Sequence, residues 1–250
     1  MIEGAPAPGG AAAAPGRRPA RRDGPPLALL AAISAALLLA AYLVTGLLAG
    51  GFSLSPAATA ASVLGELRHS DAIRTGAVLG FGSAVPLGIY AATVSARLRN
   101  LGIRAPGATI ALFGGVFAAG LLSVGSLASW ALSEPLASPQ PALLQVVQNI
   151  GLAAAGPGRL AGLGLLLAGV AVPAAFTGLL PRPLVAAGLG LALLDELSTL
   201  TLFSDLPARL GVALAVLGLA SLAWLTAAGA LLPLTRQSPG ARRPGRTPKE

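Results

Sequence analysis

Six apolar runs of similar length follow one another along this chain, and more polar segments separate them. Crossing the roughly 30 Å hydrocarbon core of a bilayer takes about twenty helical residues, and each run is about that long. The pattern therefore predicts an all-α fold, a polytopic transmembrane bundle of six helices. The predicted spans are residues 27–49, 72–94, 108–132, 158–180, 184–203 and 208–233.

Two segments between the spans have the pattern of shorter amphipathic helices. In residues 50–71, apolar positions recur at helical spacing between polar ones. In residues 133–158, Leu143 and Ile150 fall on one helical face and Gln148 falls on the opposite face. Both segments are too polar to cross a membrane along their whole length. We therefore expect two short outer interfacial helices beside the six spans.

Composition supports a membrane protein and narrows its chemistry. Hydrophobic residues make up 54% of the chain and charged residues only 10%, whereas about a quarter of the residues of soluble domains are charged. With no Cys and with His69 as its one His, the chain offers no thiolate or multi-histidine metal site. The sequence motifs of serine hydrolases, zinc proteases and phosphate-binding loops are missing too. We expect no cofactor, no metal and no enzymatic activity.

The formal net charge of +8 arises mainly from basic residues that flank the apolar runs. The tails at 1–26 and 235–250 combine Arg with Pro and Gly, a composition that predicts disorder and leaves 27–234 as the membrane domain. Arg97 and Arg99 mark the loop between the second and third spans. Loops rich in Lys and Arg stay in the cytoplasm, so we expect both termini on that side. Because these charges flank spans, nucleic acid is not an expected partner.

Two adjacent acidic residues, Asp195 and Glu196, interrupt the apolar run 184–203. A charged side chain at the bilayer centre costs about 3 kcal/mol on insertion scales, so the pair needs polar surroundings. Asp195 shares a helical stripe with Gly188 and Thr199, whereas Glu196 points about 100° away. We expect Asp195 to be buried between helices and Glu196 to need a second contact, such as Thr199.

Arg159, at the outer end of the fourth predicted span, is the first candidate partner for this pair. The short turn at 181–183 makes the fourth and fifth spans neighbours, while Arg74 and Arg209 are alternative partners. The pair has three interpretations: a coupling carboxylate in a proton or cation pathway, a structural polar clamp, or a headgroup pair in a shifted span. The candidate intramembrane polar site comprises Asp195, Glu196, Thr199 and Arg159.

A resemblance to known proteins is carried by three runs: SAVPLGIYAATVSARLRNLG, APGATIALFGGV and LGLLLAGVAVPAAFTGLLPRPLVAAGLGLALLDELSTLTL. Across roughly residues 70–235 the chain resembles a group of uncharacterised bacterial multi-pass membrane proteins that is catalogued as a domain of unknown function. The resemblance implies an integral protein of the inner (cytoplasmic) membrane with this architecture. It implies no activity, ligand or site.

These observations predict a non-enzymatic accessory, regulatory or structural component of the cytoplasmic membrane. The alternative is a small proton-coupled transporter or channel that uses Asp195 and Glu196. The expected partners are the lipid bilayer and either a second copy of this chain or another membrane protein.

Overall fold

The computed structural model describes residues 25–48, 69–103, 106–135, 140–203 and 209–233, and this part of the chain is helical without strands. Six helices are long and apolar enough to cross a membrane, which confirms the predicted fold class. The α-helices are α1 (Leu27–Leu48), α3 (Ser70–Asn100), α4 (Gly107–Ser133), α5 (Pro141–Ala153), α6 (Arg159–Thr177), α7 (Arg182–Leu197) and α8 (Arg209–Leu231). A π-helical segment, Ala154–Gly158, joins α5 to α6, and a 3₁₀ segment, Ser198–Phe203, continues α7.

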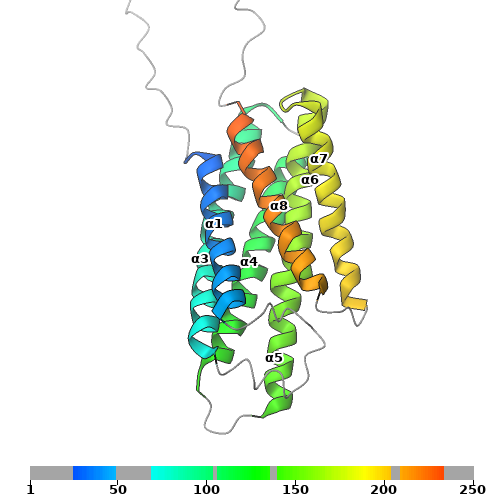
Figure 1. The fold of residues 1–250 in the computed structure, drawn as a ribbon. Helices are drawn as coiled ribbons and strands as arrows, with labels where there is room; N and C mark the ends of the chain where they lie inside the picture. The colour runs from blue at the N-terminus through cyan, green and yellow to red at the C-terminus, as the bar shows by residue number, and fades with distance from the viewer. Residues whose placement is uncertain (1–24, 49–68, 104–105, 136–139, 204–208, 234–250) are drawn as a thin grey trace, which may run out of the picture.

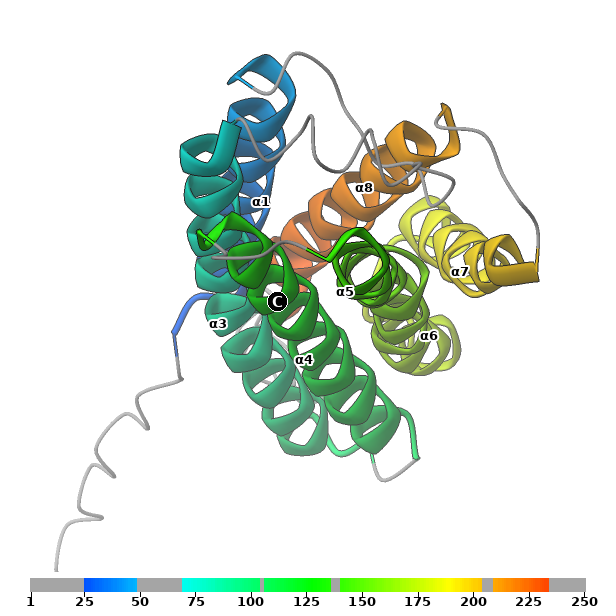
Figure 2. The same ribbon diagram turned by 90° about the horizontal axis from the view of Figure 1, so that it is seen from below.

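The spans form a closed ring in which each packs against the next (Figures 1 and 2). α1 lies on α3, α3 on α4, α4 on α6 and α6 on α7. α8, the last span, contacts both α7 and α1 and so closes the ring. Because neighbours along the chain are also neighbours in space, consecutive spans can be joined without a crossover.

α6 is the most buried of the spans. Leu163, Leu167 and Val170 are completely buried on its inner side. Toward α4 the contact is made by glycine, since a Cβ atom at Gly162 would lie 2.6 Å from the backbone nitrogen of Ala118. Small residues allow two membrane helices to approach closely.

The second predicted interfacial segment contains a short helix, α5, as expected, but this helix joins the next span directly. Pro141–Ala153 leads through the π-helical segment into α6, and the backbone kinks at Gly156 within the helical stretch Pro141–Thr177. Figure 1 accordingly shows α5 as an extension of α6 beyond the neighbouring helices α7 and α8. The other predicted interfacial helix, in residues 50–71, falls almost entirely outside the described residues.

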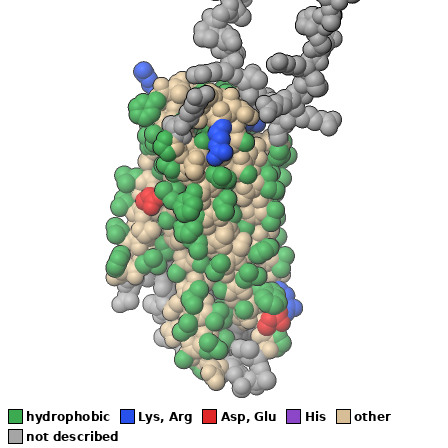
Figure 3. All heavy atoms as spheres, turned by 180° about the vertical axis from the view of Figure 1, so that it is seen from behind, with side chains coloured by type: hydrophobic (Ala, Val, Ile, Leu, Met, Phe, Trp, Pro, Cys, Tyr) green, Lys and Arg blue, Asp and Glu red, His purple; other side chains and the backbone are tan. Residues whose placement is uncertain are grey.

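Large hydrophobic side chains cover the outside of the bundle. Leu193, Phe113 and Val216 are each about 60% exposed, although large apolar side chains are the ones most often buried in soluble proteins. Figure 3 shows hydrophobic side chains (green) spread over the flank of the molecule, with basic ones (blue) toward its ends. This distribution fits a surface that is solvated by lipid.

Candidate functional site

The break between α5 and α6 determines how Arg159 is presented. Pro157 has no backbone N–H, and Gly156 has non-helical backbone angles (φ −90°, ψ −109°), so the α-helical ladder is interrupted here. The backbone N–H of Arg159 reaches back to the carbonyl of Ala154, five residues earlier. The carbonyl of Ala155 instead accepts a hydrogen bond of 2.8 Å from Nε of the Arg159 side chain. The break thus supplies the acceptor that orients the guanidinium.

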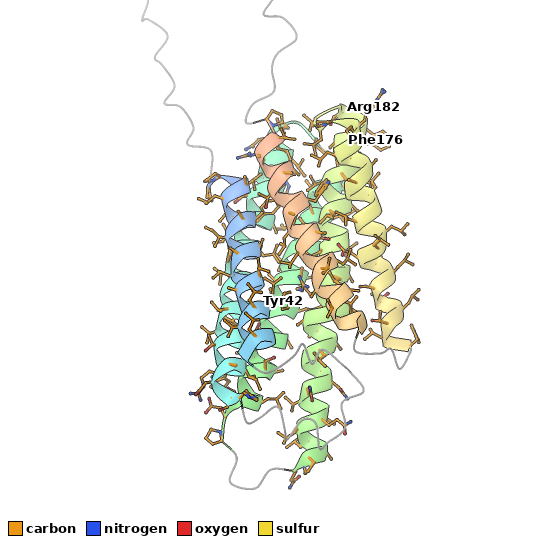
Figure 4. The ribbon with its side chains drawn as sticks, in the orientation of Figure 1. Tyr42, Phe176 and Arg182 are labelled. Carbon is orange, nitrogen blue, oxygen red and sulfur yellow. The ribbon has the colours of Figure 1, made fainter. Side chains whose placement is uncertain are left out.

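The Arg159 side chain extends into the centre of the bundle and is only 1% exposed. Its Nη2 donates to the hydroxyl of Tyr42 on α1 at 3.3 Å, and Figure 4 shows Tyr42 at mid-height in the bundle. The guanidinium lies directly against Gly218 of α8, where any side chain would collide with it. Nη1 has no hydrogen-bond partner in the part of the chain that the structure describes. One arginine therefore links α6 to α1 and α8.

Asp195 is fully buried where α7 faces α8. Its Oδ2 accepts a hydrogen bond of 2.8 Å from the hydroxyl of Ser221, halfway along α8. Its Oδ1 has no hydrogen-bond partner among the residues that the structure describes. In the described part of the chain, an ion pair within 4 Å joins only Arg74 to Glu134, so Arg159 and Asp195 are near each other without direct contact.

The two groups meet α8 on one face. Arg159 lies over Gly218 and Asp195 bonds to Ser221, three residues further along. Three residues of α-helix advance about 4.5 Å and keep nearly the same face. We call Arg159, Asp195, Tyr42 and Ser221 the central polar cluster.

Glu196 and Thr199, the other two predicted site residues, lie outside this cluster. Glu196 is exposed on the outer side of α7, with one carboxylate oxygen near Gly164 of α6. The Thr199 hydroxyl donates to the backbone carbonyl of Glu196 at 2.7 Å and not to its carboxylate. The predicted contact between the Glu196 side chain and Thr199 is therefore wrong, because the 3₁₀ segment that begins at Ser198 turns the hydroxyl toward the backbone.

Arg159 is the first residue of α6, which agrees with its predicted place at the start of the fourth span. α5 precedes it across the kink at Gly156, so helical residues lie on both sides of Arg159. Of the alternative partners, Arg74 pairs with Glu134, and the side chain of Arg209 falls outside the described residues. The sequence analysis did not identify Tyr42 or Ser221, although each is a polar residue within an apolar span.

No group of three or more His, Cys, Asp or Glu residues that could hold a metal ion occurs among the described residues. Comparisons of this chain with protein-family models, with curated proteins and with solved structures gave no match. The resemblance to uncharacterised bacterial membrane proteins therefore stays a prediction.

Proposed function

We propose that this chain is a non-enzymatic, multi-pass protein of the bacterial cytoplasmic membrane that acts as an accessory, regulatory or structural component. The observation that carries the proposal is the position of the central polar cluster, where α8 closes the ring against α7 and α1. Hydrogen bonds from Arg159 and Ser221 reach α1 and α7 there. In this role the cluster is a clamp that fixes how the spans fit together.

Membrane energetics support a clamp. Apolar faces gain little by leaving lipid for protein, so helix association in a bilayer depends on close packing and on hydrogen bonds between helices. Each such bond contributes about 1 kcal/mol. A buried carboxylate or guanidinium that loses its partner is unfavourable, so the cluster disfavours any other seating of α8.

The distribution of charge supports a cytoplasmic location for one end of the bundle. This is the end at which α1 begins and α8 ends (Figure 1). Arg182 is labelled at that end in Figure 4, and α3 ends there with Arg97 and Arg99 in its last turn. At the other end, Arg74 is paired with Glu134. The positive-inside rule assigns the end with the unpaired arginines to the cytoplasm.

A topology assay tests this orientation directly, because the chain has no Cys of its own. Single substitutions Asn100→Cys and Pro135→Cys place exposed thiols at opposite ends of the bundle. In intact cells, a membrane-impermeant maleimide is expected to label the Pro135 position and to miss the Asn100 position. The reverse labelling pattern would contradict the proposed orientation.

Proton-coupled transport is the second candidate, and one observation favours it. Arg159 Nη1 and Asp195 Oδ1 are buried inside the bundle without hydrogen-bond partners among the described residues. Ionisable groups within a membrane span commonly serve ion or proton pathways. Asp195 would be the residue that binds and releases a proton, with Ser221 and Arg159 beside it.

One pair of measurements on Asp195→Asn separates the two candidates. For a clamp, vesicles with the wild-type protein show no more proton flux than empty vesicles, and the variant unfolds more readily in detergent. For a transporter, wild-type vesicles show proton flux, and the folded variant loses it. Glu134→Gln, which alters a carboxylate at the end of a span, is the matched control for both readouts.

A further inference from the structure

The outer face of α7 carries a regularly spaced stripe of exposed residues. Ala186, Leu189, Leu193 and Glu196 follow one another at intervals of three, four and three, and all are exposed. A helix presents one continuous line of contact to a partner helix at this spacing. α7 packs on α6 and α8 with its other sides. We call this stripe the α7 seam: Ala186, Leu189 and Leu193 form its exposed centre, and Glu196 lies at its edge, where one carboxylate oxygen approaches Gly164 of α6.

Glu196 makes this seam unlike the rest of the lipid-facing surface. Its neighbour Asp195 bonds to Ser221 halfway along α8, which sets the depth of the pair. Helix rise also places Glu196 within the hydrocarbon core, which is about 30 Å thick, since Glu196 is about 21 Å along α7 from Arg182 at the end of the bundle. The Glu196 carboxylate makes no hydrogen bond or ion pair with any residue that the structure describes.

Lipid tails offer no hydrogen-bond donor to a carboxylate at this depth. A charged side chain there costs about 3 kcal/mol on insertion scales, and the oxygens cannot be satisfied without another polar group. The exposed leucines on either side, Leu193 and Leu197, provide none. A basic side chain from another helix would neutralise the charge and satisfy the oxygens together.

We propose that the α7 seam binds a transmembrane helix of another membrane protein, and that this helix carries an Arg or Lys at the depth of Glu196. The inference rests on the proposed role as an accessory component and names the chemistry of its partner. A second copy of this chain fits less well. The exposed arginines of the described residues, Arg74, Arg99 and Arg182, lie near helix ends, so a copy has no described basic side chain to place beside Glu196.

Synthetic helices in lipid vesicles test this seam. The probes are polyleucine transmembrane peptides with an acceptor dye and with Arg, Leu or Glu at the centre. The full chain carries a donor dye on Asn100→Cys, in vesicles of phosphatidylcholine and phosphatidylglycerol. Energy transfer is expected to report association with the Arg peptide about tenfold stronger than with the Leu peptide. Glu196→Leu is expected to abolish this preference.

Matched variants assign the effect to the seam. Leu193→Phe, within the seam, is expected to weaken binding of the Arg peptide, whereas Val216→Phe, on the exposed face of α8, leaves it unchanged. An Arg preference that survives Glu196→Leu would overturn the proposal. Transfer between donor-labelled and acceptor-labelled copies of the chain that depends on Glu196 would also overturn it, by making the partner a second copy.

The failure of this inference is distinguishable from the failure of the proposed function. Proton flux that depends on Asp195 would refute the clamp and leave the peptide result untouched. Conversely, vesicles that show no flux and no Arg preference would refute the α7 seam alone.

Discussion

Asp195 and Glu196 are consecutive in the chain, yet they occupy opposite kinds of environment. The carboxylate of Asp195 is fully buried and accepts a hydrogen bond from α8. The carboxylate of Glu196 is exposed on the outer side of α7, with no hydrogen bond to the described residues. Successive side chains on a helix point about 100° apart, so Asp195 and Glu196 face different surroundings although they are neighbours in the sequence. The side of α7 that faces the bundle therefore stabilises the fold, and its exposed side is available for association with another helix.

Removal of the basic partner inside the bundle should have the largest effect on this comparison. Arg159→Met removes the positive charge near Asp195 together with the hydrogen bonds to Ala155 and Tyr42, and it is expected to lower the free energy of unfolding by about 3 kcal/mol. The double variant Arg159→Met with Asp195→Leu is expected to recover part of this loss, because no unpaired charge is left. Titration with a denaturing detergent, followed by helical circular dichroism, measures both values.

The outer carboxylate is the control for that experiment. Glu196→Leu replaces an exposed, unpartnered group and should leave the free energy of unfolding unchanged or higher. If Glu196→Leu and Arg159→Met destabilise the protein equally, the contrast between the two sides of α7 is refuted.

Two glycines on α7 sharpen the comparison at the next smaller scale. A Cβ atom at Gly188 would collide with the indole ring of Trp224, whereas a Cβ atom at Gly190 would meet nothing within 4 Å. Gly188→Ala should therefore lower the free energy of unfolding by about 2 kcal/mol through overpacking. Gly190→Ala should change it by less than about 0.5 kcal/mol. Equal effects of the two substitutions on detergent-induced unfolding would contradict the assigned orientation of α7.

Ser221→Ala probes the one hydrogen bond that the carboxylate of Asp195 receives from the described residues. The substitution leaves Asp195 Oδ2 buried without a donor, and we expect a loss of about 1 kcal/mol in the free energy of unfolding. Thr226→Ala on the same helix is the matched control, since the Thr226 hydroxyl bonds only to the backbone carbonyl of Leu222. A Ser221→Ala protein no less stable than Thr226→Ala would mean that this bond does not hold α7 to α8.

Among the substitutions in the central polar cluster, Tyr42→Phe should lower the free energy of unfolding least. The hydroxyl of Tyr42 accepts a long hydrogen bond of 3.3 Å from Arg159 and is only partly buried. We expect a loss of about 0.5 kcal/mol in the free energy of unfolding, measured as for the other variants. In the Arg159→Met background the same substitution should have no effect, and a persistent loss there would show that Tyr42 acts through another contact.

The sequence by itself determined the number of spans and the different environments of Asp195 and Glu196. Length and hydropathy specify membrane helices because lipid leaves the backbone no other hydrogen-bond partners. The 3.6-residue period also fixes the angle between two side chains on one helix, so the burial of Gly188 and Asp195 on one stripe was predictable.

Only the tertiary structure decided which residues from different helices meet. The position of Arg159 depends on how α5 and α6 meet, and periodicity does not indicate that the helical path continues through the Gly-Pro-Gly segment with a kink at Gly156. Tyr42 and Ser221 join the cluster because α8 closes the ring between α1 and α7. Local pattern constrains angles within one helix, whereas distances between helices follow from the packing of all of them.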